Sequence, residues 1–115
     1  MSTTMYHNPK CSKCRLTLQL LEDNQVTTDV VEYLTTPPDA KTLGNILQML
    51  GIEPRDLMRK HEAEYRALNL DNPDLGRDEL IRAMLENPIL IERPIVIKDG
   101  KAAIGRPPEN ILKIL

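Results

Sequence analysis

The chain has 115 residues, a net charge of -2 and 41% hydrophobic residues, the composition of one ordinary globular domain. The balanced charge predicts no basic surface for nucleic acid or an acidic membrane, and the lack of Trp and Phe argues against stacking on nucleobases. The first residues form no basic and apolar leader, and no apolar stretch approaches bilayer length. We therefore expect a cytoplasmic protein without nucleic-acid or membrane partners.

A strand, a helix and a second strand are predicted at the beginning of the chain. Residues 3–7 form the first strand, residues 12–24 a leucine-rich helix, and residues 28–33 a strand rich in β-branched residues. The crossover helix makes the two strands parallel. Because its leucines leave only a narrow polar face, we expect the helix to be well buried.

The next helix is predicted to begin at Thr36 as its N-cap. Pro37 then occupies the first helical position, and Asp39 follows three residues after the cap. Gly51 ends this helix. Its apolar residues recur at i, i+3, i+4 and i+7, as expected for an amphipathic helix, and are Leu43, Ile46, Leu47 and Leu50.

Residues 52–76 are interrupted by proline and glycine, which predicts short helical pieces. We expect these pieces at 55–60 and 61–68. A longer amphipathic helix at 77–86 follows and stops before Asn87-Pro88, because a residue that precedes proline disfavours the helical conformation.

A β-hairpin and a final helix complete the chain. Asp99-Gly100 lies between two short strands at 95–98 and 101–104 and favours a type I′ turn, and the last helix runs to Leu115. This order of elements is that of the thioredoxin-like fold. The sequence thus predicts a single α/β domain, residues 1–115, with a mixed four-stranded sheet and a helical insertion at about 36–91.

Both cysteines lie where the first helix begins. Exposed backbone N–H groups and the helix dipole stabilise a thiolate at Cys11, and nearby Lys10, Lys13 and Arg15 add positive charge. Cys14 lies one helical turn later, in reach of the first sulfur and less exposed, which suits a resolving thiol or a buried side chain. In a reducing compartment such a pair is more often catalytic or regulatory than a permanent disulfide.

A structural zinc site is the less favoured reading of these cysteines. It would need Cys11 and Cys14 together with His7 and His61, and no second Cys or His pair has the spacing of a zinc finger. A reactive thiol is favoured instead.

Three arginines are candidate anion ligands. Arg93 and Arg106 flank the hairpin, so its two-residue turn brings them close together at one edge of the sheet. If the first strand ends at that edge, the two guanidinium groups face the Cys11 loop and form a receptor for a tetrahedral oxyanion. Arg59 lies in the helical insertion.

The segments His7-Asn8-Pro9-Lys10-Cys11, Arg93-Pro94 and Gly105-Arg106-Pro107-Pro108-Glu109 resemble those of the glutaredoxin-coupled arsenate reductase family, over residues 5–115. The resemblance implies that Cys11 attacks arsenate as a thiolate and that His7 lowers its pKa. It also implies a cis peptide bond before Pro94. The residues expected to bind the oxyanion are Arg59, Arg93, Arg106 and Ser12.

The implied reaction replaces an arsenate oxygen by sulfur. Glutathione, as co-substrate, then attacks the arsenic adduct, glutaredoxin regenerates the enzyme, and arsenite is released; neither a metal nor a bound cofactor is required. The sequence departs from the family pattern at Cys14, where well-known members carry a serine or another residue without a thiol. A Cys11–Cys14 disulfide, reduced by thioredoxin or glutaredoxin, is thus a second route.

Two other functions stay open. Spx-type regulators, which share the fold and bind the α subunit of RNA polymerase, also contain a Cys-x-x-Cys pair, and a general glutathione-dependent thiol reductase would use the same thiol. Gly105-Arg106-Pro107 favours the arsenate reductase, because the regulators have no need of an arginine there.

Overall fold

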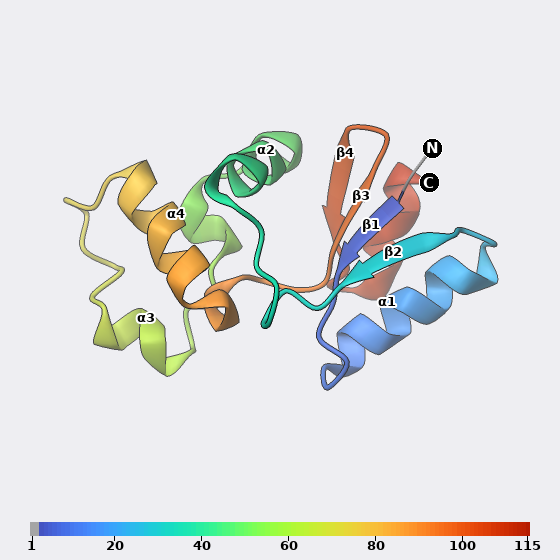
Figure 1. Cartoon of the computed structure of the whole chain (residues 1–115), viewed down its shortest axis with the longest axis horizontal. Coiled ribbons are helices and arrows are strands. Elements are labelled where there is room, and N and C mark those ends of the chain that lie inside the picture. The colour runs from blue at the N-terminus through green and yellow to red at the C-terminus, as the bar shows by residue number, and fades with distance from the viewer. Residues whose placement is uncertain (1–2) are drawn as a thin grey trace. The chain divides into compact units, whose positions relative to one another are not determined.

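The computed structural model describes residues 3–115, which form two compact units. The first unit contains the chain up to Thr36 together with Arg93–Leu115, and the second contains Pro37–Glu92. Figure 1 shows the sheet in the first unit and helical elements in the second. The second unit covers nearly the same residues as the predicted helical insertion.

The first unit contains a mixed four-stranded sheet in the order β2-β1-β3-β4. Strand β1 (Thr3–Tyr6) pairs in parallel with β2 (Thr28–Val31) and antiparallel with β3 (Ile95–Lys98), which pairs antiparallel with β4 (Lys101–Ile104). Helix α1 (Ser12–Asp23) makes the crossover between β1 and β2. The predicted thioredoxin-like α/β arrangement is therefore confirmed.

The hairpin turn has the predicted conformation. Asp99 and Gly100 have φ values of 53° and 78°, as both central residues of a type I′ turn require. The turn sets the register in which Ile95 lies opposite Ile104. Just beyond this pair, the Gly105 N–H donates to the Pro94 carbonyl over 2.9 Å, so the two arms stay together where they leave the sheet.

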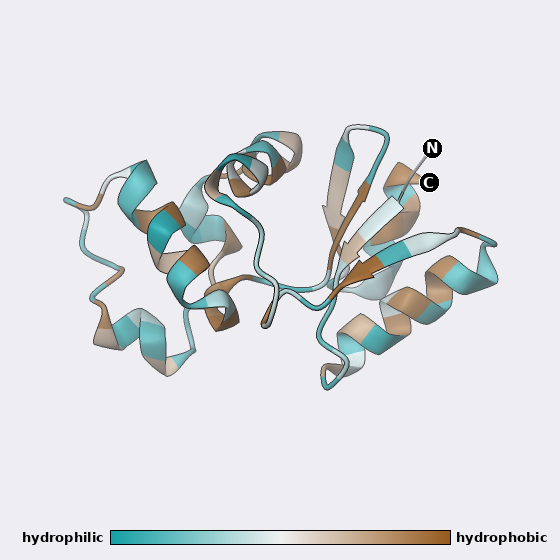
Figure 2. Cartoon of the chain, in the orientation of Figure 1, coloured by the Kyte–Doolittle hydropathy of each residue, from teal (hydrophilic) through white to brown (hydrophobic). Residues whose placement is uncertain are grey.

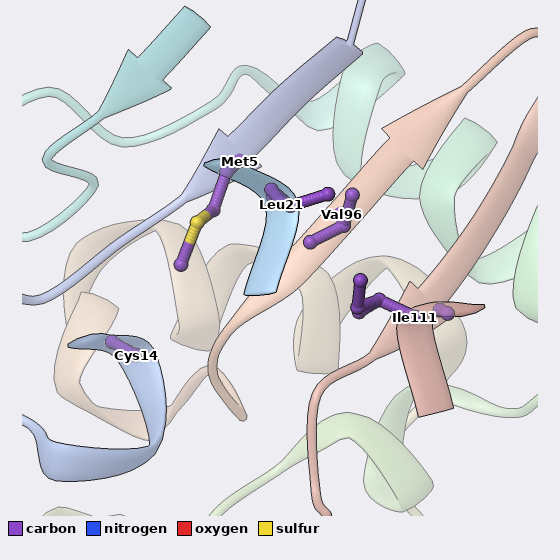
Figure 3. Packing of buried hydrophobic residues seen from close by; sticks show 6 residues of the cluster. Met5, Cys14, Leu21, Val96 and Ile111 are labelled. Carbon is purple, nitrogen blue, oxygen red and sulfur yellow. The ribbon is translucent and has the colours of Figure 1, made fainter. Parts of the chain in front are cut away.

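The core of the first unit is aliphatic, as the composition predicts. Met5 on β1 lies opposite Val96 on β3, and Val96 lies opposite Ala103 on β4, so all three side chains point to one face of the sheet. Figure 3 shows α1 and the C-terminal segment on that face, where they contribute Cys14, Leu21 and Ile111.

Helix α1 is less buried than predicted. Only Cys14, Thr17 and Leu21 are buried on it, whereas Leu16 is 54% exposed. The helix covers one face of the sheet with a single apolar stripe, so Leu18 and Leu20 at the edges of that stripe are only partly buried against the core and Leu16 faces outward. The last helix also differs, because Pro108–Ile114 forms a 3-10 helix (η3).

The second unit contains α2 (Ala40–Leu50), the 3-10 helix η1 (Pro54–Leu57), α3 (Ala63–Ala67), α4 (Arg77–Glu86) and the 3-10 helix η2 (Pro88–Leu90). The helix predicted at 77–86 and the short pieces after Gly51 are confirmed, with η1 and α3 shorter than expected. Alternating hydrophilic and hydrophobic segments along α2 and α4 in Figure 2 show their amphipathic character. No helix within residues 3–115 is long and apolar enough to cross a membrane.

The start of α2 was predicted wrongly. Its N-cap is Asp39, whose carboxylate accepts from the Thr42 N–H over 2.7 Å. Thr36 and Pro37 each precede a proline, and this position disfavours the helical conformation for both residues. The end of α2 is as predicted, with Gly51 in the left-handed region at φ 67°.

Candidate active site

The loop between β1 and α1 holds Cys11 at the helix N-terminus. The Asn8 side chain accepts from the Lys10 N–H over 3.0 Å, and the Asn8 carbonyl accepts from the Cys11 N–H over 2.9 Å. The Arg15 guanidinium donates to the Pro9 carbonyl over 2.9 Å. Cys11 is the N-cap residue of α1, so its side chain lies beside the first N–H groups of the helix, as predicted.

The pKa of Cys11 is lowered from 9.0 to about 7. Burial on its own would raise this pKa, but hydrogen bonds outweigh it, namely those from the Cys14 N–H, the Arg93 side chain, the Cys14 thiol and the Lys13 N–H. About half of the Cys11 side chains are thus thiolates at pH 7. A cysteine in this state is a nucleophile at neutral pH.

Arg93 and Arg106 both reach this sulfur, as the hairpin geometry predicted. Arg106 Nη2 lies 3.4 Å from Cys11 Sγ, and Arg106 Nε donates to the Arg93 carbonyl over 2.6 Å. The side chain of Arg93 also hydrogen-bonds to Cys11. Each strand of the hairpin therefore has an arginine just beyond its outer end, and both guanidinium groups lie at the thiol.

Gly105 keeps the hairpin close to α1. A Cβ atom at this position would lie 2.5 Å from Thr17 Oγ1 and 2.8 Å from Pro94 Cγ, too close for any side chain without movement. The Arg93–Pro94 peptide bond is cis, as the family resemblance implies, and Arg106–Pro107 is cis as well. The two arginines that reach Cys11 thus each precede a cis proline.

Cys14 has a very different environment from Cys11. Its side chain is 0% exposed and lies in the core beside Met5 and Leu21. Burial raises its pKa to about 11, and the neighbouring Cys11 contributes in the same direction. Both cysteines are free thiols, so Cys14 is a neutral thiol that donates a hydrogen bond to its charged neighbour.

His7 is buried, with 6% of its surface exposed. Burial lowers the pKa of His7. The negative charge of Glu32 raises this pKa and the positive charge of Arg15 lowers it further. Within the described chain, Nδ1 of His7 has no hydrogen-bond partner. A neutral imidazole adds no positive charge at the thiol, so the influence of His7 on Cys11 stays a prediction. Ser12 is the exposed first residue of α1, and its contact with substrate also stays a prediction.

Arg59 lies in the second unit, where carboxylates hold its guanidinium. Nε contacts Glu62 at 3.0 Å and Nη1 contacts Glu92 at 3.1 Å. Nη2 lies 3.0 Å from His61 Nε2. The role of Arg59 in oxyanion binding stays a prediction. Among residues 3–115, no three His, Cys, Asp or Glu side chains form a group that could hold a metal ion.

Two positioning contacts were not predicted from the sequence. The Arg93 Nη1 group donates to the Tyr33 hydroxyl over 3.4 Å, and Asn110 Nδ2 donates to the Arg106 carbonyl over 2.9 Å. Tyr33 was assigned to the second strand, but β2 ends at Val31 and Tyr33 lies in the following turn. The signal for Asn110 is weak, since a polar residue early in a helix most often caps it or faces solvent.

Comparison with known proteins identifies the family of the chain. The model of the ArsC family matches residues 6–114. The chain belongs to the ArsC family. The predicted kinship with arsenate reductases is thereby confirmed.

The proteins similar to this ArsC-family protein match it over nearly its whole length. The uncharacterized protein YfgD of Escherichia coli K12 is 54% identical over 112 residues, which are 96% of this chain and 94% of YfgD. An arsenate reductase of Neisseria meningitidis serogroup A is 49% identical over 112 residues, 96% of each chain. The solved structure of an arsenate reductase from Vibrio cholerae is 50% identical with a TM-score of 0.97, covering 100% of this chain and 98% of its own.

Proposed function

We propose that this protein is an arsenate reductase in which Cys11 is the nucleophile. The contact of Arg106 Nη2 with Cys11 Sγ at 3.4 Å carries the proposal, because it joins the thiolate to a cationic anion ligand. Relatives named arsenate reductase at 49% identity support arsenate as the substrate.

In the first step the Cys11 thiolate forms a sulfur–arsenic bond. Hydrogen arsenate loses its hydroxyl group, which takes up one proton from solvent and leaves as water, and arsenic stays in the +5 state. Arg93 and Arg106, with the N–H groups of the first turn of α1 and Ser12, stabilise the negative charge of the oxyanion. We include Arg59 among the oxyanion ligands on the family resemblance.

In the second step a thiol attacks Cys11 sulfur in the adduct. A disulfide forms, the sulfur–arsenic bond breaks with its electron pair on arsenic, and arsenite leaves after taking up the proton of the thiol. Glutathione would supply this thiol, and glutaredoxin would then reduce the mixed disulfide. No cofactor is bound in this scheme.

Cys14 is the internal alternative for this second thiol. Burial raises the pKa of Cys14 to about 11, so little thiolate forms at this sulfur near pH 7 and its attack is slow unless the thiol is deprotonated in concert. This argument favours glutathione over a Cys11–Cys14 disulfide that thioredoxin or glutaredoxin would reopen.

A coupled assay tests the proposal. In the glutathione arm, purified protein is incubated with arsenate, NADPH, glutathione, glutaredoxin and glutathione reductase. In the thioredoxin arm, it is incubated with arsenate, NADPH, thioredoxin and thioredoxin reductase. We expect arsenate-dependent NADPH consumption in the glutathione arm. No consumption in either arm would refute the proposal, and consumption in the thioredoxin arm alone would identify Cys14 as the second thiol.

A redox-sensing regulator of the Spx type is the second candidate. The hydrogen bond between the Cys14 thiol and Cys11 favours it, because a disulfide could form between these neighbours. Oxidation would then change the affinity for the α subunit of RNA polymerase. Equal affinity of the reduced and oxidised proteins would exclude this function.

A further inference from the structure

Tyr33 lies in a turn that follows the edge strand β2. The Thr35 and Thr36 N–H groups donate to the Glu32 carbonyl over 3.1 and 3.0 Å, and the Thr35 hydroxyl donates to the same oxygen over 3.0 Å. This turn directs Tyr33 inward, where it is 1% exposed, while the next residue, Leu34, is 38% exposed. A side chain this buried, on a turn this closely hydrogen-bonded, has little freedom to move.

The Tyr33 hydroxyl accepts a hydrogen bond from Arg93 Nη1 over 3.4 Å. A phenol is uncharged at neutral pH, so it orients a guanidinium without neutralising it. The carboxylates of Glu62 and Glu92 on Arg59 have the opposite effect, because they cancel the charge that they orient. The Tyr33 hydroxyl therefore orients Arg93 without placing a negative charge beside it.

Arg93 connects Tyr33 to the thiol by two paths. Its side chain hydrogen-bonds directly to Cys11. Its carbonyl accepts from Arg106 Nε over 2.6 Å, and the same Arg106 side chain reaches Cys11 Sγ through Nη2. A displacement of Arg93 would therefore disturb both guanidinium contacts of the sulfur.

We propose that Tyr33 is a positioning residue that holds the Arg93 guanidinium against the Cys11 thiol and against the oxyanion that this thiol attacks. The effect on the oxyanion rests on the proposed reductase function, whereas the effect on the thiol does not. Tyr33 acts through Arg93 and need not touch the substrate.

The experiment compares Tyr33→Phe with the wild-type protein. Phenylalanine keeps the buried ring and removes only the hydroxyl, so the turn and the core stay packed. The rate of Cys11 alkylation by iodoacetamide is measured from pH 5 to pH 9, with the modified peptide identified by mass spectrometry. Loss of one hydrogen bond to the guanidinium should lower the rate at pH 7 by about threefold and move the midpoint to higher pH. Tyr65→Phe, in α3 of the second unit, is the matched control and should leave the profile unchanged.

A double-mutant cycle separates positioning from a general structural role. Tyr33→Phe is repeated in an Arg93→Gln background, where the proposal predicts no further change in the alkylation profile. An equal effect in both backgrounds would overturn the proposal, as would an unchanged midpoint in Tyr33→Phe. Thermal unfolding of each variant shows whether a changed profile reflects partial unfolding.

Steady-state arsenate kinetics complete the test. Tyr33→Phe should raise the KM for arsenate by about three- to tenfold, with a smaller change in kcat, because the hydrogen bond orients an anion ligand. If the wild-type protein reduces no arsenate while Tyr33→Phe still shifts the Cys11 profile, the reductase function fails and the positioning of the thiol stands. If the wild-type protein is active and Tyr33→Phe leaves both the profile and KM unchanged, the positioning role fails alone.

Discussion

Arg93 and Arg106 in the first unit and Arg59 in the second are held by different kinds of partner. Arg93 donates to the Tyr33 hydroxyl, and Arg106 donates to the Arg93 carbonyl and to the Cys11 sulfur. Arg59 contacts the carboxylates of Glu62 and Glu92. The Tyr33 phenol and the Arg93 carbonyl orient a guanidinium without adding negative charge, whereas a pair of carboxylates neutralises the charge that it orients. The hairpin arginines thus lie at the thiol, whereas the contacts of Arg59 join residues of its own unit.

Cys11→Ser gives the largest expected effect, because it removes the sulfur that both hairpin arginines contact. Arsenate-dependent NADPH consumption should fall to background, since serine is not ionised at neutral pH.

Cys14→Ser should retain turnover with glutathione within about threefold, because the hydroxyl can replace the thiol as a donor to Cys11. Loss of turnover in Cys14→Ser would show that the internal disulfide is obligatory.

Arg106→Lys tests whether geometry or charge matters on the thiol side of the comparison. Lysine keeps the positive charge but cannot donate at once to the Arg93 carbonyl and the Cys11 sulfur. We expect kcat/KM for arsenate to fall by about tenfold, which corresponds to about 1.4 kcal/mol. Arg93→Lys should weaken arsenate binding for the same reason. Unchanged kinetics in both variants would mean that charge alone suffices.

Arg59→Ala tests the carboxylate side. Glu62 and Glu92, whose side chains are 22% and 24% exposed, would lose their contacts with Arg59, so the free energy of unfolding should fall by about 1–2 kcal/mol. Urea denaturation measures this change, with Arg66→Ala, an exposed arginine of α3, as the matched control. A loss no larger than that of the control would remove the stabilising role.

The pH dependence of stability should separate the two cysteines, because they act in different pH ranges. The pKa of Cys11 is lowered on folding, so its contribution is complete above pH 9 and is lost as the pH falls through about 7. The pKa of Cys14 is raised, so its contribution is complete below pH 9 and is lost as the pH rises through about 11. Urea denaturation at pH 6, 9 and 11 measures both losses of stability. The loss between pH 9 and pH 6 should disappear in Cys11→Ser, and the loss between pH 9 and pH 11 should disappear in Cys14→Ser.

Local signals in the sequence predicted most of the first unit. The type I′ turn depends on the conformations of two adjacent residues, Asp99 and Gly100. The start of α1 after Cys11 was likewise predicted from neighbouring residues. The start of α2 failed because two consecutive prolines overrode the capping pattern at Thr36.

Side-chain pairing over long distances in the sequence was not predictable in the same way. Arg59 and Glu92 are 33 residues apart, and Arg93 and Tyr33 are 60 apart, so no periodic pattern relates them. The convergence of Arg93 and Arg106 on Cys11 was predicted because the hairpin converts 13 residues of separation into proximity. The remaining contacts depend on how the strands and turns pack in three dimensions.

The length of the Asp99-Gly100 turn sets the spacing of Arg93 and Arg106, which lie at the opposite, open end of the hairpin. Adding one residue beside Gly100 would slip the pairing of Ile95 with Ile104, and a slip of one residue in a strand reverses the direction of every side chain that follows. Arg106 would then point away from the sulfur although no residue near Cys11 had changed. Variation in the length of this remote surface turn should therefore be as damaging to catalysis as the loss of an arginine.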